Sequence, residues 1–407
     1  MNWPICGRSL SRELRVIRSN HTVVLCGLLL YTVLTGGCSI RSPFVSDELL
    51  SPIVEAVNHD EVVQSIFLIG DAGKPSAKRR EPTLAALTRQ ASHRPEKSLI
   101  LFLGDNIYSY GMPEESDDGR LEAERKINEQ VRVVEESGAR AIFMPGNHDW
   151  RGGWEAILRQ EEFLVSKENA NVLFLPHGGC PGPEVIDLSD RLRLVILDTQ
   201  WWLEEGSKPE HPDSDCGPDS KEEVIDSLAQ ALHDAGERYV LVVGHHPLDT
   251  HGRHGGFFDW KDHLFPLRVV KSWMWIPLPG LGSLYPLARS LGITNQDLSS
   301  SAYRDMKARI EGVLSERPPL AYVAGHEHVL QVLRGSGPYL LVISGSGTSD
   351  HSPTLTTGSN TLFAHMHPGF VRIDFLRDGS VRLGVIVPID GHGASKEVFS
   401  MWLVAVE

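Results

Sequence analysis

The stretch Ser-Leu-Ile-Leu-Phe-Leu-Gly-Asp-Asn-Ile-Tyr occupies residues 98–108 and passes from an apolar run directly into polar side chains. A short apolar run that is closed by glycine is typical of a buried β-strand. Gly104 allows the backbone to turn sharply after the strand, and Asp105, Asn106 and Tyr108 follow it. The stretch therefore predicts a strand whose end presents side chains that can bind a metal ion.

Four other apolar runs end in the same way, with a glycine followed by polar side chains. The runs and the residues after them are 65–70 with Asp71, 140–145 with Asn147, His148 and Asp149, 238–244 with His245 and His246, and 320–325 with His326 and His328. Because ligands of α/β proteins bind beyond the carboxyl ends of the strands, we expect the five strand ends to meet. Each cluster alone is weak, since a Gly-Asp pair usually marks a turn and a His-x-His pair is more often a surface feature. Their joint occurrence predicts a metal site.

Polar stretches of helical length and periodicity alternate with these strands. The sequence predicts helices at 81–92, 121–137, 221–235 and 301–316, and further strands at 193–198 and 339–344. The end of the chain instead resembles antiparallel strands joined by turns, at 369–376, 380–388 and 398–406. This order predicts one α/β domain whose sheets finish in an antiparallel set.

The composition is that of a folded protein. The chain has 407 residues, of which 41% are hydrophobic and 23% charged, and these fractions exclude a disordered chain, a collagen-like repeat and a polytopic membrane protein. Acidic residues outnumber basic ones by 53 to 39. This balance argues against non-specific nucleic-acid binding, but a bound metal ion would still allow a phosphate substrate.

The first forty residues have the pattern of an export signal. Four arginines precede an apolar run at 23–35, and Gly36, Gly37 and Cys38 follow it. The run is shorter than the roughly 20 residues that a membrane-spanning helix needs. A cysteine after small residues resembles the lipobox of bacterial lipoproteins, in which the thiol receives the lipid, although Thr35 stands where leucine is usual. Simple secretion and an uncleaved anchor are the alternatives.

The expected organisation is a signal peptide at 1–37, a linker at 38–60 and a catalytic domain at 61–407. We expect the chain to be exported to the periplasm or cell envelope of a bacterium and attached to a membrane through a lipid anchor on Cys38. Cys180 and Cys216 lie in loop sequence rich in glycine and proline. An oxidising compartment would allow them to form a disulfide, although two free thiols are the alternative.

The order GD, GDN, GNHD, GHxP and GHxH resembles that of the calcineurin-like metallophosphoesterases, from about residue 65 to beyond residue 328. That resemblance implies a four-layer αββα sandwich, in which two mixed sheets are flanked by helices. One departure is that Asp71 is followed by alanine and glycine instead of the superfamily's Asp-x-His. Tyr108 offers a replacement ligand, and together with the stretches 103–108 and 325–333 it resembles the small, single-domain purple acid phosphatases.

The resemblance implies two metal sites. Asp71, Asp105, Tyr108 and His328 would hold the first ion, with Asp105 bridging to the second. Asn147, His245 and His326 would complete the second site. A phenolate beside carboxylates favours Fe(III) in the first site, whereas the second set suits Fe(II), Zn(II) or Mn(II) without distinguishing them. His246 is not a ligand in the family pattern, so we interpret it as a residue at the rim or behind the ligands.

The implied reaction is hydrolysis of a phosphomonoester, in which a metal-bound hydroxide attacks phosphorus. His148 would reach the phosphate, and His254 stands nine residues after His245, where the subgroup places its second catalytic histidine. His251 is the competing candidate. Asp149 is expected either to orient His148 or to cap a helix.

An apolar insertion lies at residues 257–300, between the GHxP and GHxH clusters. It contains several tryptophans and leucines, interspersed with prolines. The sequence leaves three interpretations: a small satellite core, a rim that admits amphiphilic phosphate substrates, or a surface that faces a membrane.

Two other functions remain open from the sequence. One is a phosphodiesterase or pyrophosphatase acting on nucleotide- or lipid-linked phosphate, which Tyr108 disfavours because the related diesterases generally keep Asp-x-His. The other is a binding lipoprotein on a retired enzyme scaffold, which the presence of all seven ligands disfavours.

Overall fold

The computed structural model describes residues 39–40, 42–49, 51–55, 57–166, 169–212, 214–269, 273–348 and 353–405. The expected signal peptide and Cys38 lie outside the described residues. Within these ranges, no helix is both long and apolar enough to cross a bilayer.

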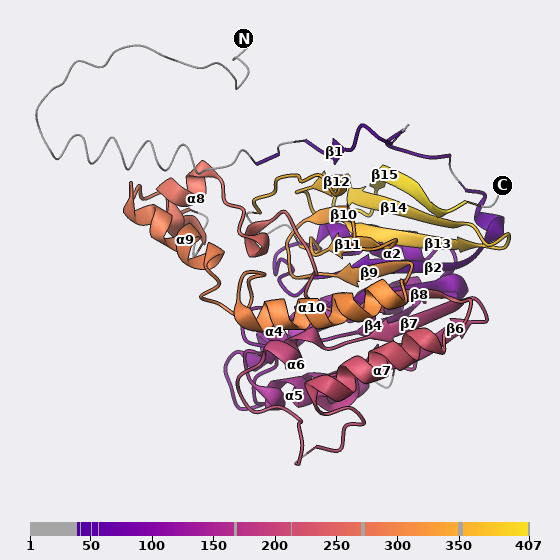
Figure 1. Ribbon diagram of the computed structural model, residues 1–407, viewed down its shortest axis with the longest axis horizontal. Helices are drawn as coiled ribbons and strands as arrows, with labels where there is room; N and C mark the ends of the chain where they lie inside the picture. The colour runs from indigo at the N-terminus through magenta and orange to yellow at the C-terminus, as the bar shows by residue number, and fades with distance from the viewer. Residues whose placement is uncertain are drawn as a thin grey trace, which may run out of the picture.

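The described strands form two mixed sheets (Figure 1). In spatial order, the eight-stranded sheet contains β1 (Phe44–Val45), β12 (Thr361–His365), β10 (Leu330–Arg334), β11 (Leu340–Ser344), β9 (Ala321–Ala324), β8 (Tyr239–Val243), β7 (Leu192–Ile196) and β6 (Glu184–Ser189). The seven-stranded sheet contains β15 (Ser395–Val404), β14 (Val381–Pro388), β13 (Phe370–Leu376), β2 (Val62–Ile69), β3 (Ser98–Phe102), β4 (Arg140–Phe143) and β5 (Val172–Phe174).

Helices cover the outer faces of the two sheets. The described α-helices are α2 (Pro82–Ala91), α3 (Arg120–Ser137), α4 (Asn147–Trp150), α5 (Trp154–Val165), α6 (Thr199–Leu203), α7 (Lys221–His233), α8 (Trp260–Leu264), α9 (Leu284–Ser290) and α10 (Ser301–Glu316). Short 3-10 helices are η1 (His59–Glu61), η2 (Pro95–Lys97), η3 (His177–Gly179), η4 (Arg253–Gly255), η5 (Pro266–Val269) and η6 (Leu281–Ser283). Figure 1 shows α7 and α10 lying across the sheet that contains β7 and β8, whereas α8 and α9 project from the body.

The alternation of side chains along each strand divides the core into layers. Ile66 and Leu68 of β2 belong to the cluster that lies between the sheets, whereas Phe67 and Ile69 pack with Leu87 of α2 on the outer face. Both faces are apolar because both are covered, which explains why the strands appear in the sequence as continuous apolar runs. The expected αββα sandwich is confirmed, as are the antiparallel strands at the end of the chain.

Parallel pairing aligns the strand ends that carry the polar clusters. Strands β2, β3, β4 and β5 are parallel, and Phe102 of β3 lies opposite Ile69 of β2 and Phe143 of β4. In the other sheet β7, β8, β9 and β11 are parallel. The carboxyl ends of the parallel strands in each sheet therefore share one edge.

Some features of the fold were not expected from the sequence, among them α5, β5, β6 and β12, and one feature settles an alternative that the sequence left open. Part of the expected linker forms β1, which pairs with β12. This strand was not predicted because two residues are too few to show the alternation of side chains that marks a strand. Strand β10 follows His328 directly and was not expected as a separate strand. Cys180 and Cys216 form a disulfide with their Cα atoms 5.6 Å apart, so the alternative of two free thiols does not hold.

Candidate metal centre

The five strand ends meet where the two sheets approach each other. The Gly70 amide after β2 donates to the Ser344 carbonyl of β11, in the other sheet, at 2.7 Å. Gly146 explains how closely the loops approach, because a Cβ atom there would lie 2.3 Å from the Asp105 amide nitrogen and 2.5 Å from Asp105 Oδ1. Only glycine fits at that position.

Three of the predicted ligands adopt the left-handed backbone conformation, which non-glycine residues rarely do. The φ angles are 58° at Asp71, 57° at Asp105 and 65° at His326. Carboxylates help to hold these turns, since the His326 amide donates to Asp71 Oδ2 at 2.8 Å and the His148 amide donates to Asp105 Oδ1 at 2.7 Å. Strain of this kind is found preferentially at functional sites.

A first group of three donor atoms contains a carboxylate, a phenol and an imidazole. The Tyr108 hydroxyl lies 2.8 Å from Asp71 Oδ1 and 3.0 Å from His328 Nε2. His328 Nε2 is also 3.3 Å from Asp71 Oδ1. These three atoms come from the loops after β2, β3 and β9.

A second group contains an amide oxygen and two imidazoles. Asn147 Oδ1 lies 3.1 Å from His245 Nε2 and 2.9 Å from His326 Nδ1. The other nitrogen of His245 contacts the Leu103 carbonyl at 2.7 Å, which fixes the orientation of its ring. All three side chains are buried.

Asp105 connects the two groups. Its Oδ1 lies 3.5 Å from His245 Nε2, and ligand atoms of Asp71, Asp105 and His245 all lie within 4.8 Å of one another. The structure therefore brings all seven predicted ligands together, in the two groups that the sequence resemblance implied.

The buried acidic groups of this cluster favour a bound cation. Burial, together with the charge of Asp105, raises the pKa of Asp71 to about 8. Burial and the same two carboxylates raise the pKa of Tyr108 far above its ordinary value. A cation between these groups would offset both effects and stabilise the carboxylate and phenolate forms.

Two of the predicted histidine ligands, His326 and His328, are suited to bind a metal because burial favours their neutral forms. Burial, then the neighbouring His254, lowers the pKa of His328 to about 3. The pKa of His326 is also lowered well below its ordinary value, by burial and by the histidines around it. Neutral imidazole is the form that coordinates metal ions. The donor set and its electrostatics therefore fit the implied metals.

His148 lies at the edge of the first group. Its ring packs against Tyr108 with centroids 4.2 Å apart, and its Nδ1 contacts the Ser109 carbonyl at 3.0 Å. Its Nε2 lies 3.9 Å from Asp105 Oδ2. The ring is thus fixed beside the cluster.

The structure distinguishes the two candidates for a second catalytic histidine. The His254 ring lies against the His326 ring, with centroids 3.9 Å apart. His251 instead points away, with its Nε2 2.7 Å from Asn360 Oδ1 and its ring against Phe257. Of the two, His254 is the one that contacts a predicted ligand.

Neither His246 nor Asp149 occupies a ligand position within the two groups. His246 lies near His245 and His326, but its two ring nitrogens contact Thr199 Oγ1 at 2.8 Å and Gln296 Oε1 at 2.9 Å. The Asp149 carboxylate accepts from the backbone amides of Gly146, Asn106 and Ile107. Of the two roles expected for Asp149, the structure therefore shows the helix cap, at Gly146 before α4, and the same carboxylate also links the loop after β3 to the loop after β4. The His148 ring is oriented by the Ser109 carbonyl instead.

Several residues that the sequence analysis did not assign hold His254 in place. Glu327, between two predicted ligands, accepts from the His254 amide at 2.9 Å. The Gln296 carbonyl lies 2.9 Å from His254 Nδ1, and Asp297 Oδ1 lies 3.3 Å from the same atom. Arg289 of α9 donates to both oxygens of Asp297 at 2.5 Å. Glu327 could have been found from the sequence, because it is an acidic residue within the GHxH motif.

Comparison with known proteins identifies a family. Residues 65–330 match the model of a family described as calcineurin-like phosphoesterases. No curated protein sequence matches the chain.

Two solved structures are similar to this chain. One is GAP50, the anchor in the inner membrane complex of Plasmodium, with 14% identity, a TM-score of 0.52, and coverage of 83% of this chain and 88% of that chain. The other is the purple acid phosphatase PPD1 from yellow lupin seeds, with 13% identity, a TM-score of 0.48, and coverage of 83% of this chain and 53% of that chain. At these identities the first likeness concerns the fold alone.

Proposed function

The chain belongs to the calcineurin-like phosphoesterase family and is therefore a phosphoesterase, and from this premise we propose that it is a binuclear metal-dependent phosphatase acting on phosphomonoesters. The observation that carries the proposal is the sorting of seven donors into two groups that Asp105 connects. A single metal ion would not need both groups.

The first group, with Asp105, would hold Fe(III), because phenolate and carboxylate are hard ligands. The second group, again with Asp105, would hold Fe(II), Zn(II) or Mn(II). When bound, the two ions supply charge neutralisation for the phosphate and activate a water molecule.

His148 and His254 have separate roles in the proposal. His148 is fixed beside Asp105 and Tyr108, where its ring would contact the bound phosphate. His254 would protonate the leaving alcohol through Nε2. The Gln296 carbonyl, the Asp297 carboxylate and the Arg289 guanidinium all lie near His254 Nδ1, at 2.9, 3.3 and 3.2 Å, and together they fix the orientation of the ring.

Substrate class is tested with paired aryl esters. The metal-free protein is reconstituted with iron and zinc, then assayed with p-nitrophenyl phosphate and bis(p-nitrophenyl) phosphate. We expect kcat/KM to be at least about tenfold higher for the monoester, because a phenolate-containing first site is the feature that separates this chain from the diesterase pattern. A preference for the diester would overturn the monoesterase proposal and favour the phosphodiesterase alternative.

His254→Asn is expected to lower kcat by about 10²–10⁴-fold with unchanged metal content, because the substitution removes a proton donor without removing a predicted ligand. His251→Asn is the matched control and should leave kcat within about threefold, since His251 points toward Asn360. Steady-state kinetics and metal analysis of both variants check this. Equal losses in the two variants would refute the assignment of His254.

We also propose export and a lipid anchor on Cys38. The arginine-rich start, the apolar run and the small residues before Cys38 support this location. The disulfide between Cys180 and Cys216 supports an oxidising compartment.

The insertion supplies Arg289 beside His254 and exposes apolar side chains, which supports amphiphilic phosphate esters as one substrate class.

A further inference from the structure

Helix α9 exposes its apolar side to solvent. Leu284 and Leu287 lie on one side of the helix, three residues apart, and Leu291 at its end continues that side. All three are exposed, Leu291 to 69%. The opposite side carries Arg289, whose guanidinium faces Asp297 within the protein. A helix of a soluble protein normally buries its apolar side, so this orientation is the reverse of the usual one.

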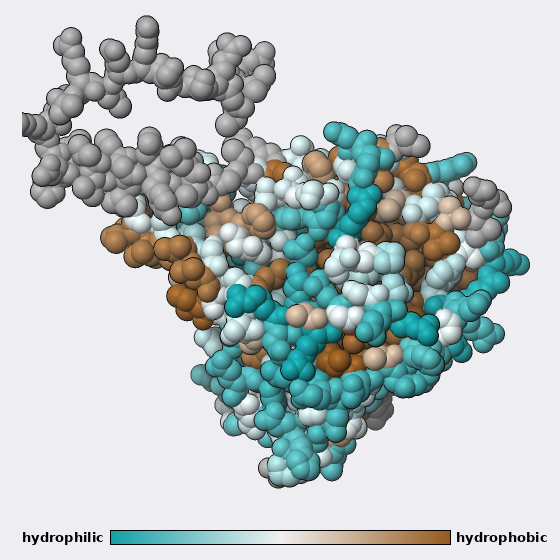
Figure 2. Space-filling view, viewed as in Figure 1, coloured by the Kyte–Doolittle hydropathy of each residue, from teal (hydrophilic) through white to brown (hydrophobic). Residues whose placement is uncertain are grey.

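Exposed apolar residues before α9 extend the same surface. Trp273 is 74% exposed, and Trp275 and Leu281 are also exposed. We call Trp273, Trp275, Leu281, Leu284, Leu287 and Leu291 the insertion face; Figure 2 shows brown surface in this region, over α8 and α9. A satellite core would have buried these side chains, so the structure argues against that interpretation of the insertion. Exposed apolar surface of this kind marks a site of interaction.

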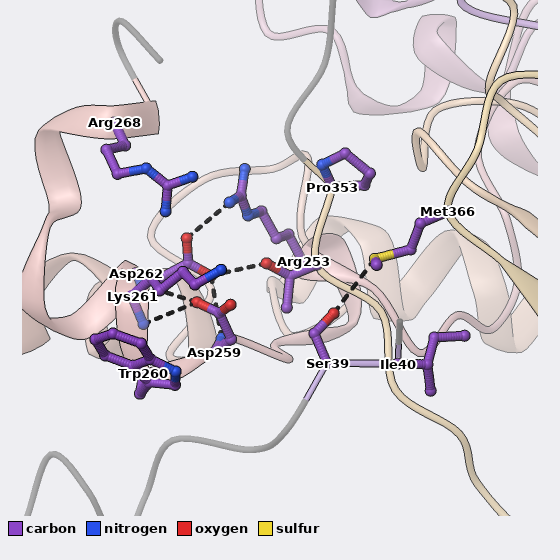
Figure 3. Close-up of a pocket in the computed structure, with 11 residues that line it drawn as sticks. Ser39, Ile40, Arg253, Asp259, Trp260, Lys261, Asp262, Arg268, Pro353 and Met366 are labelled. Carbon is purple, nitrogen blue, oxygen red and sulfur yellow. Dashed lines mark hydrogen bonds and ion pairs between the residues drawn. The ribbon is translucent and has the colours of Figure 1, made fainter. Parts of the chain in front are cut away.

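The first described residues of the chain, Ser39 and Ile40, lie beside the insertion. A pocket of about 330 Å³ has Ser39 and Ile40 on one side and Trp260, Lys261 and Arg268 of the insertion on the other (Figure 3). Hydrogen bonds at 3.0 Å between the Ser39 hydroxyl and both backbone groups of Leu355 hold this exit point. Ser39, the first described residue, therefore lies next to the insertion.

The residues that precede this point are those expected to associate with a membrane. An acylated Cys38, or the apolar run at 23–35 if it is retained, would bring a bilayer to the position of Ser39. The insertion also offers positive charge at this position, from Lys261 and from Arg268, whose guanidinium lies 4.1 Å from the Trp275 ring centroid. Basic side chains next to tryptophan suit anionic headgroups at the bilayer interface.

We propose that the insertion face docks on the surface of a lipid bilayer, the same membrane to which residues 1–38 attach the chain. The apolar side chains enter the interfacial region, and Lys261 and Arg268 face the phosphates of the headgroups. Since α9 contacts the site through Arg289, docking also fixes the orientation of the metal centre relative to the membrane. The proposal does not depend on phosphatase activity.

Depth-dependent quenching tests the proposal with the full chain. The protein is reconstituted into vesicles of phosphatidylcholine and phosphatidylglycerol at 3:1, with or without phosphatidylcholine brominated on its acyl chains, and tryptophan emission is recorded. Bromine quenches only tryptophans that reach the bilayer. We expect brominated lipid to reduce the emission of the wild-type chain, and we expect Trp273→Phe/Trp275→Phe to lose at least half of that reduction. Phenylalanine keeps the apolar surface, so the double variant should fold.

Trp154→Phe is the matched control, because Trp154 lies in α5, which Figure 1 shows in the lower part of the molecule, away from α8 and α9, with its Nε1 hydrogen-bonded to the Gly178 carbonyl. It should keep the wild-type reduction. The proposal would be overturned by an absence of quenching in the wild-type chain, or by equal quenching in the wild-type and double-variant chains. A chain that dimerises in detergent through the insertion face and is not quenched would assign that face to a second copy instead.

Discussion

Asp105→Asn is expected to reduce kcat/KM by more than about a thousandfold and to remove both metal ions, because Asp105 is the one predicted ligand that connects the two groups of donors. Asparagine has the same shape and keeps an oxygen that can accept from the His148 amide, as Asp105 Oδ1 does at 2.7 Å. The loss would therefore come from the missing charge. Metal analysis and kinetics with an aryl phosphate measure the two effects.

Thermal unfolding of the metal-free variant separates this effect from misfolding. The charge of Asp105 contributes to the raised pKa of Asp71, so removing that charge relieves repulsion inside the empty cluster. We therefore expect the metal-free variant to unfold at the same temperature as the metal-free wild-type protein or at a higher one. Asp226→Asn on the exposed surface of α7 is the matched control and should alter neither activity nor metal content. Full activity in Asp105→Asn would refute the bridging role.

Tyr108→Phe is expected to abolish the visible colour of the iron-loaded protein. Tyrosinate bound to Fe(III) gives a purple charge-transfer band, and phenylalanine lacks the oxygen that would bind the metal. We also expect less iron in the first site and a kcat/KM about 10–100-fold lower, because Asp71 and His328 remain as ligands. Absorption spectroscopy with metal analysis checks both.

Tyr110→Phe is the matched control, since Tyr110 lies two residues away and is 69% exposed. It should keep the purple band. A wild-type protein that is fully metal-loaded but colourless, with only manganese or zinc, would contradict the assignment of Tyr108 as a ligand to Fe(III). The phosphodiesterase or pyrophosphatase alternative would then be favoured.

The sequence predicted most of the fold because the two sheets are buried on both faces. Runs such as 65–70 and 98–104 appear as short apolar segments, and the structure places β2 and β3 there. The family match over residues 65–330 agrees with the predicted fold. Strand β1 and helix α9 were not predicted, because the first is too short to show a period and the second has its apolar side toward solvent.

The positions of the predicted ligands were also accessible from the sequence. Each follows a strand by one to a few residues, and glycines such as Gly146 mark the close approaches between loops. The sequence did not predict which residues hold the His254 ring in place. Gln296 and Asp297 lie more than forty residues after His254 and reach it only because the insertion folds back onto the site.

The amino-acid sequence by itself determined the order of the elements, the identity of the donor side chains and the family, because these depend on local patterns of apolar and polar residues. The tertiary structure decided whether His254 or His251 contacts the predicted ligands, that Cys180 pairs with Cys216, and which side of the insertion is exposed. These properties depend on distances between segments that are remote in the chain, and only the packing of the two sheets and the insertion sets those distances.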